Sequence, residues 1–130
     1  MILLDTDICV ELLRGNQRVL ERRAHSTETA AVAAMTVAEL FYGAEKSRRP
    51  AENRGLVEQF ILSVPVIHTS LPILRRWGHW KADLELRGTP LTDADVLIAV
   101  TAMDCCAQLV TGNTDHFSRF PGLRLDNWLR

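Results

Sequence analysis

The stretch Met1-Ile2-Leu3-Leu4-Asp5-Thr6-Asp7 opens the chain with four apolar residues, followed by two acids separated by a threonine. A short apolar run that ends in an acid is typical of a buried strand in a parallel sheet. The acids follow the run at once, so it is interpreted as a strand and not as a signal peptide. Asp7 is expected to cap a helix that continues through Leu13 and is closed by Gly15.

The same alternation of short apolar runs and helical segments continues along the chain. Further strands are predicted at Ala30–Met35, Val64–Ile67 and Gln108–Thr111, with an edge strand at Leu123–Leu125. Helices are predicted over residues 18–25, 36–46, 50–62, 72–86 and 92 to about 106. This order predicts an α/β fold with a mainly parallel sheet. No repeat or linker interrupts residues 1–130, so a single domain is expected.

The composition excludes several classes of protein. Of the 130 residues, 47% are hydrophobic and 24% are charged, as in a globular domain, and no run approaches the ~20 apolar residues of a membrane helix. The three cysteines, Cys9, Cys105 and Cys106, have no CxxC spacing, which favours reduced thiols in the cytoplasm over disulfides or a zinc site. A net charge of −1 gives no support for a nucleic-acid partner, so any such partner must be argued from a site.

Acids far apart in the sequence occupy equivalent places in the predicted fold. Asp5 ends the first strand, Glu39 and Asp95 lie in the first turns of two predicted helices, and Asn113 and Asp115 follow the last core strand. In an open parallel sheet these places share one edge, where ligands bind. Carboxylates gathered there repel one another unless a cation offsets their charge. Oxygen ligands suit Mg²⁺ or Mn²⁺, ions that activate water for attack on a phosphodiester.

Each acid also has a purely structural explanation. Thr36-Val37-Ala38-Glu39 fits a capping box, in which Glu39 would reach back to the cap backbone. Thr92-Asp93-Ala94-Asp95 has the same shape, and the helix dipole favours acids in a first turn. Asp115 fits an ordinary turn. Asp5 is the hardest to explain in this way, because a carboxylate that closes a buried strand needs a partner.

Four blocks of the sequence, in order, resemble those of PIN domains of the VapC toxin family. They are Ile2–Asp7, Thr36–Gly43, Leu91–Ala99 and Leu109–Phe117, and the tail Pro121–Trp128 is also similar. In the third block the active-site acid of the family stands just before an apolar Leu-Ile-Ala run, which points to Asp95 and not Asp93. The resemblance covers nearly the whole chain. It implies a three-layer α/β/α sandwich with four or five central strands.

The same resemblance implies an activity and a set of site residues. The family implies a Mg²⁺- or Mn²⁺-dependent endoribonuclease that cleaves RNA, is held inactive by a VapB-like antitoxin and is commonly a homodimer. Asp5 and Asp95 would be the main metal ligands, and Glu39 would complete the site or orient the water. Many relatives have aspartate where this chain has Asn113, so either Asn113 or Asp115 is expected to act as the fourth residue. Candidates to support these side chains are Thr6, Asp7, Asp93 and Thr111, although a role as a helix cap or a structural hydrogen-bonding residue explains each of them better.

Two other kinds of protein remain as alternatives. The stretch Asp5-Thr6-Asp7 is similar to the start of haloacid-dehalogenase-like phosphatases, but Cys9 breaks the last position of that motif, and Lys46 and Lys81 are the only lysines. The second alternative is a module without catalysis, either receiver-like or a degenerate PIN domain that only binds RNA. A receiver would have a lysine after the last core strand, where this chain has Thr111-Gly112-Asn113.

Overall fold

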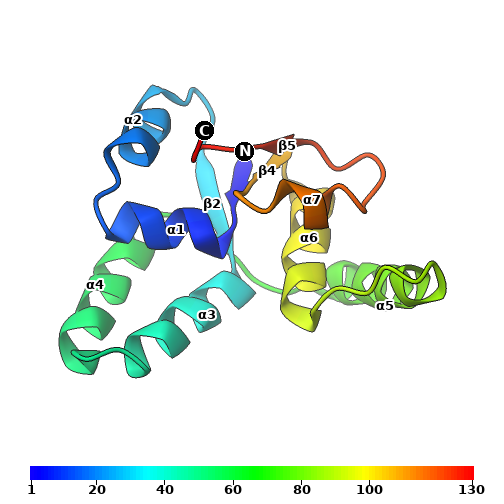
Figure 1. Cartoon of the computed structure of the whole chain (residues 1–130), viewed down its shortest axis with the longest axis horizontal. Helices are drawn as coiled ribbons and strands as arrows, with labels where there is room; N and C mark the ends of the chain where they lie inside the picture. The colour runs from blue at the N-terminus through cyan, green and yellow to red at the C-terminus, as the bar shows by residue number, and fades with distance from the viewer.

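Five parallel strands form one sheet in the computed structural model, which describes residues 1–130. The strands are β1 (Ile2–Leu4), β2 (Ala30–Ala33), β3 (Val66–Ile67), β4 (Gln108–Val110) and β5 (Leu125–Asp126), in the order β3-β2-β1-β4-β5. The helices are α1 (Thr6–Leu13), α2 (Gln17–His25), α3 (Ala34–Glu45), α4 (Pro50–Leu62), α5 (Leu71–Leu86), α6 (Asp93–Cys105) and α7 (Thr114–Phe117). Figure 1 shows this arrangement, which confirms the predicted α/β fold and parallel sheet.

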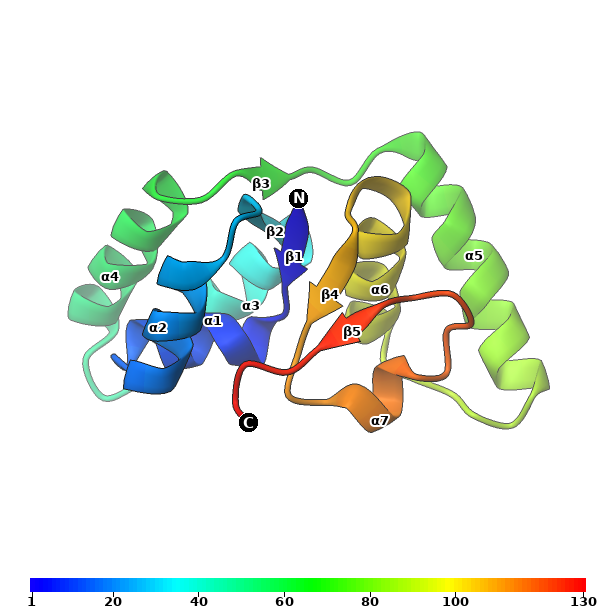
Figure 2. The same ribbon diagram turned by 90° about the horizontal axis from the view of Figure 1, so that it is seen from above.

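Successive side chains of each strand enter two separate hydrophobic clusters, one on each face of the sheet. Ile2 and Leu4 pack with α1, α2, α3 and α4, whereas Leu3 between them packs with α5 and α6. Strand side chains alternate between faces, and both faces are covered, so the central strands β1 and β2 have apolar residues at every position. Figure 2 shows helices on both sides of the sheet, which makes the predicted three-layer sandwich. Burying a side chain such as Leu3 stabilises the fold by roughly 1.5–3 kcal/mol.

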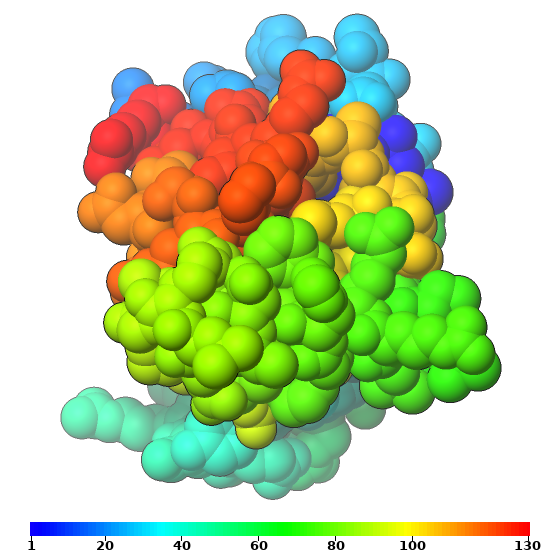
Figure 3. All heavy atoms as spheres, turned by 90° about the vertical axis from the view of Figure 1, so that its right-hand side faces the viewer, coloured from blue at the N-terminus to red at the C-terminus, as the bar shows by residue number.

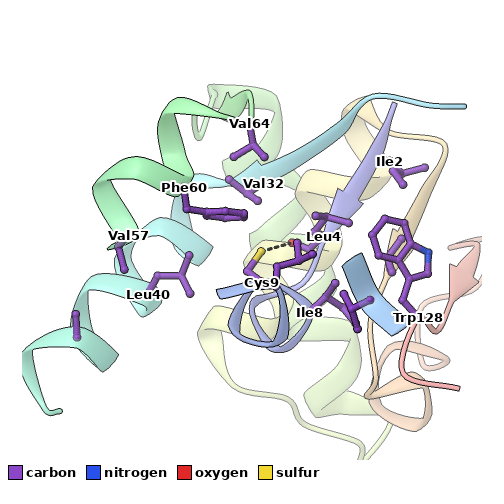
Figure 4. Packing of buried hydrophobic residues seen from close by; sticks show 14 residues of the cluster. Ile2, Leu4, Ile8, Cys9, Val32, Leu40, Val57, Phe60, Val64 and Trp128 are labelled. Carbon is purple, nitrogen blue, oxygen red and sulfur yellow. Dashed lines mark hydrogen bonds between the residues drawn. The ribbon is translucent and has the colours of Figure 1, made fainter. Parts of the chain in front are cut away.

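The first cluster centres on the contact between β1 and α1. Ile8 and Cys9 of α1 are fully buried against Leu4, and Phe60 of α4 closes the cluster from the far side (Figure 4). The Cys9 thiol lies 4.0 Å from the carbonyl oxygen of Leu4, and burial raises the pKa of this thiol far above its usual range. Cys9 is therefore an inert core residue.

The second cluster lies under α5 and α6. Ile73 and Leu84 of α5 pack against α6, which is the most buried helix of the chain. Figure 3 shows α5 as the outermost element on this side, with α6, α7 and the C-terminal segment beside it. None of the seven helices combines the length and the apolar character that a membrane crossing requires.

Several predicted boundaries are wrong, each for a local reason. The strand predicted to reach Met35 ends at Ala33, and α3 begins at Ala34, because Thr36 is fully buried and does not cap the helix. Asp5, and not Asp7, is the N-cap of α1. The segment after β4 was expected to be a loop but contains the short helix α7, and the predicted edge strand lies at Leu125–Asp126.

The strand order reverses direction at β1, and this places the site. The chain runs from β1 to β2 on one side, while β4 pairs with β1 on the other side. Ligands bind outside the carboxyl ends of the strands at such a point. Asp5 follows β1 and Thr111 follows β4, so both lie at this edge.

Candidate active site

Asp5 is the buried centre of the site, with only 6% of its surface exposed. One carboxylate oxygen, Oδ1, accepts a hydrogen bond of 2.8 Å from the backbone N–H of Thr6. The other, Oδ2, accepts one of 2.7 Å from the hydroxyl of Thr111. The first bond caps α1 and the second joins the ends of β1 and β4, so the fold fixes this carboxylate on both sides. Each oxygen retains a further lone pair for a ligand.

Asp7 supports the loop that follows β4. Its Oδ2 accepts a 2.8 Å hydrogen bond from the backbone N–H of Gly112, and its Oδ1 accepts one of 2.8 Å from Ile8. A Cβ atom at position 112 would lie 2.8 Å from Oδ2 of Asp7 and would also collide with the side chain of Leu129. A larger residue would have to displace the Asp7 carboxylate and the Leu129 side chain, so glycine preserves the bond between Asp7 and the loop.

Glu39 lies in the second turn of α3 and is held by a threonine of another helix. The hydroxyl of Thr6 lies 2.7 Å from Oε1 of Glu39 and 3.0 Å from the hydroxyl oxygen of Thr36. The N-cap of α3 is Ala33, which makes no side-chain cap. The capping-box interpretation of Glu39 is therefore wrong, and its carboxylate instead faces the start of α1.

Asp95 occupies the first turn of α6, as predicted. Thr92 caps this helix by accepting a 3.2 Å hydrogen bond from the backbone N–H of Asp95, and this leaves the Asp95 carboxylate available. Its charge acts on both Asp5 and Asp7. Asp93 points elsewhere and forms an exposed ion pair with Lys81 at 2.8 Å. Asp95 and not Asp93 therefore lies with the other acids, and its role in the site stays a prediction.

Crowding of these acids changes their protonation. Burial, followed by the charges of Asp7 and Asp95, raises the pKa of Asp5 from 3.8 to about 7, although the hydrogen bonds from Thr111 and Thr6 oppose the shift. The pKa of Asp7 is also raised, first by burial and also by Asp95, against the hydrogen bonds from Gly112 and Ile8. Burial is the largest cause of both shifts and the neighbouring carboxylates add to it, and a bound cation would offset both effects by favouring the charged forms.

The side chains of Asn113 and Asp115, the two candidates for the fourth site residue, are placed differently from what the sequence predicted. The backbone N–H of Asn113 donates to the Thr111 hydroxyl at 2.9 Å, and its amide nitrogen lies 2.7 Å from Nδ1 of His116. Asp115 is exposed, and its carboxylate makes no hydrogen bond or ion pair. His116, which sequence reasoning missed, lies 4.0 Å from Oδ2 of Asp95. His116 would have been recognised if a helix had been predicted directly after Asn113, because residues three positions apart on a helix are neighbours.

The donor atoms fit a hard divalent cation. No three of the acidic, histidine and cysteine side chains already form a closed metal site, so the carboxylates would have to move closer around an ion. The side chains that could hold it are Asp5 and Asp95, with Glu39 beside them. Carboxylate oxygens in a site with surplus negative charge suit Mg²⁺ or Mn²⁺.

Neither lysine contacts these acids. The Nζ of Lys46 lies 3.1 Å from the hydroxyl of Tyr42, and that of Lys81 bonds the Leu91 carbonyl and Asp93. A phosphatase that forms an aspartyl-phosphate on Asp5 would lack the lysine that such enzymes use. The geometry favours a reaction in which several carboxylates act together over one in which Asp5 alone is the nucleophile.

Comparison with known proteins places the chain in a family. The PIN domain family matches residues 2–123. The chain is 33% identical to the tRNA(fMet)-specific endonuclease VapC of Salmonella typhimurium, over 97% of this chain and 96% of that protein. It is also 33% identical to ribonuclease VapC2 of Rickettsia felis, with the same coverage.

Solved structures agree with this placement. The crystal structure of VapBC2 from Rickettsia felis, bound to a DNA fragment from the promoter, superposes with a TM-score of 0.90 at 31% identity, covering 98% of this chain and 99% of that one. The DNA-bound VapBC of Salmonella typhimurium also gives 0.90, at 33% identity, covering 98% and 97%. The chain therefore belongs to the PIN domain family and, within it, to the VapC proteins.

Proposed function

We propose that this chain is an endoribonuclease, the toxin of a VapBC-type toxin–antitoxin pair, and that it hydrolyses RNA at the acid cluster. The observation that carries the proposal is the gathering of acids at one edge of the sheet. Asp5 follows β1 and Asp95 lies in the first turn of α6, 90 positions apart, yet the pKa of Asp5 is raised by burial, by the charge of Asp7 and also by that of Asp95. Relatives named as VapC ribonucleases support the reaction class.

The site would take Mg²⁺ or Mn²⁺ on Asp5 and Asp95. When bound, such an ion offsets the charge of the RNA phosphate and lowers the pKa of a water molecule. Thr111 and the backbone of Thr6 hold Asp5 in place for this role. Of the two carboxylate oxygens of Glu39, only Oε1 accepts from the Thr6 hydroxyl, so Oε2 is left to accept a proton from the attacking water.

The antitoxin partner is proposed to bind a groove beside this site. A cavity of about 360 Å³ lies between α1, α3 and α4, and it is lined by Val10, Leu13, Leu40, Leu56 and Val57, among others. Glu39 lines the same cavity, so the groove reaches the acid cluster. An antitoxin segment with apolar side chains at helical or extended spacing would fill the groove and cover Glu39. Solved VapBC relatives are complexes with their antitoxins, which supports such a partner.

Two further parts of the proposal concern where the protein works and in what form. We place it in the cytoplasm, where RNA is present and where the three free thiols would stay reduced. A homodimer stays a prediction of the family resemblance, and sedimentation equilibrium of the purified chain tests it.

The test of the proposed activity uses purified full-length chain with total tRNA and ribosomal RNA. Cleavage is expected with Mg²⁺ or Mn²⁺, and none with EDTA or in the Asp95→Asn variant. Hydrolysis of p-nitrophenyl phosphate is measured in parallel. Phosphatase activity without RNA cleavage would instead support the haloacid-dehalogenase-like alternative, and binding of RNA without cleavage would support a module without catalysis.

A further inference from the structure

His116 is the only histidine that lies at the acid cluster. Its Nδ1 atom is 4.0 Å from Oδ2 of Asp95 and 2.7 Å from the amide nitrogen of Asn113. The other histidines lie elsewhere: His25 bonds the Glu21 carbonyl, and His68 and His79 are exposed at β3 and on α5. The imidazole therefore meets Asp95 through the packing of α7 against α6.

The position of His116 is fixed by its neighbours on α7. Phe117 is fully buried and Phe120 nearly so, and both belong to the cluster beneath α5 and α6. Arg119 donates a 3.2 Å hydrogen bond to the carbonyl of Pro90, which anchors the far end of this segment. Two buried rings and one anchored guanidinium hold the imidazole beside Asp95, so the contact does not depend on a mobile loop.

The chemistry of the ring suits a ligand. Nδ1 of His116 lies 2.7 Å from the amide nitrogen of Asn113, and an imidazole nitrogen is a common metal ligand. The cluster already contains the carboxylates of Asp5, Asp7, Glu39 and Asp95. A ring nitrogen adds one more donor atom without adding a negative charge.

The separation of the two atoms also fits a shared ion. Metal–nitrogen and metal–oxygen bonds of about 2.1 Å each allow the two ligand atoms to lie up to about 4.2 Å apart. The 4.0 Å between Nδ1 of His116 and Oδ2 of Asp95 falls within this span. An ion bound at Nδ1 would take the place of the Asn113 amide, so Asn113 would release the ring on binding.

We infer that His116 is a nitrogen ligand of the metal ion held by Asp95, and that it shifts the site toward Mn²⁺ and away from Mg²⁺. Imidazole suits transition-metal ions, whereas Mg²⁺ takes oxygen ligands almost exclusively. This inference rests on the proposed metal-dependent function. It goes beyond that function in naming a ligand that the resemblance to the family does not supply.

The experiment measures metal binding without RNA. Purified full-length chain is loaded with Mn²⁺ and studied by pulsed electron paramagnetic resonance, which detects nitrogen bound to Mn²⁺ by its electron spin-echo modulation. The parent protein is expected to show ¹⁴N modulation, and His116→Gln is expected to lose it while its Mn²⁺ affinity falls roughly tenfold. His79→Gln, a matched change on exposed α5, is expected to match the parent in both measurements.

A second variant tests the metal preference directly. His116→Asp replaces the nitrogen with a carboxylate oxygen, so the ratio of Mn²⁺ affinity to Mg²⁺ affinity is expected to fall by roughly tenfold. Mn²⁺ binding without ¹⁴N modulation in the parent would overturn this inference and leave the proposed function standing. Modulation that persists in His116→Gln would overturn it as well. Absence of any Mn²⁺ binding would overturn both the inference and the metal-dependent function.

Discussion

Thr111 donates its hydroxyl hydrogen to Asp5 at 2.7 Å, across 106 positions of sequence. The same hydroxyl oxygen accepts the backbone N–H of Asn113 at 2.9 Å. One buried side chain thus connects the acid at the end of β1 to the loop after β4. The geometry of the site depends on the pairing of two adjacent strands, so it forms only when the sheet has formed.

Asp5→Asn and Asp95→Asn are each expected to abolish RNA cleavage while the protein stays folded. Each variant removes a charge that would hold the cation, and asparagine keeps nearly the same shape. Gel assays with Mg²⁺ or Mn²⁺ measure activity, and circular dichroism checks the fold. Glu85→Gln on the exposed side of α5 is the control. Parent-like cleavage by either aspartate variant would exclude that residue as a metal ligand.

The stability of the metal-free protein is expected to fall as the pH rises from about 4 to about 7. The pKa of Asp5 is 3.8 when unfolded and about 7 when folded, so within this window the folded state binds more protons than the unfolded state. Stability then decreases with rising pH and levels off above the folded pKa. Denaturant unfolding in EDTA measures this slope. Asp5→Asn is expected to flatten it and to raise stability at pH 8 by on the order of 1 kcal/mol. An unchanged slope in Asp5→Asn would assign the effect to another group.

At the fourth position, Asn113→Ala is expected to reduce RNA cleavage by about tenfold or more, whereas Asp115→Ala leaves it within about twofold. One factor of ten corresponds to about 1.4 kcal/mol of transition-state stabilisation. The side-chain amide of Asn113 contacts His116, a contact that alanine removes, while the Asp115 carboxylate is exposed and makes no hydrogen bond or ion pair. Initial rates on one RNA substrate give the comparison. A larger loss in Asp115→Ala would show that the exposed carboxylate turns into the site when RNA is bound.

Glu39→Gln is expected to reduce cleavage by two or more orders of magnitude, about 2.7 kcal/mol of transition-state stabilisation. Glutamine can still accept the hydrogen bond from Thr6, but it cannot take a proton from water. Stability is expected to change by less than about 1 kcal/mol, because Glu39 does not cap α3. Growth arrest on expression, at matched protein levels, is the second measurement. Arrest equal to that of the parent would remove Glu39 from the active site.

Leu56→Asp is expected to leave RNA cleavage unchanged but to prevent rescue by a co-expressed antitoxin. Leu56 lines the proposed antitoxin groove and is 49% exposed, so a charge there disturbs the groove more than the fold. Leu62→Asp is the matched control, because Leu62 lies on the same helix, is 84% exposed and does not line the groove. Equal antitoxin binding by both variants, measured by co-purification, would place the partner on another surface.

The sequence was most informative where one physical rule governs a whole segment. Uninterrupted apolar runs predicted the buried parallel strands. The strand-end position of Asp5 and the helix-start position of Asp95 predicted that both lie at one edge of the sheet. The predicted start of α3 was wrong because threonine is a common N-cap residue. In the structure Thr36 is instead buried by tertiary packing, and the helix begins at Ala34. His116 was missed because α7 has only four residues, and the buried Phe117 stabilises it more than local propensity does.

Asp5 is both the central acid of the site and the N-cap of α1. Asparagine caps a helix about as well as aspartate, so Asp5→Asn removes the charge and keeps the start of α1, whose Val10 and Leu13 line the antitoxin groove. A chain silenced in this way would still take up antitoxin. Expressed together with an active copy, the inactive variant would compete for antitoxin. Less antitoxin would then be bound to the active chain, so one substitution that abolishes activity would increase the toxicity of the other copy.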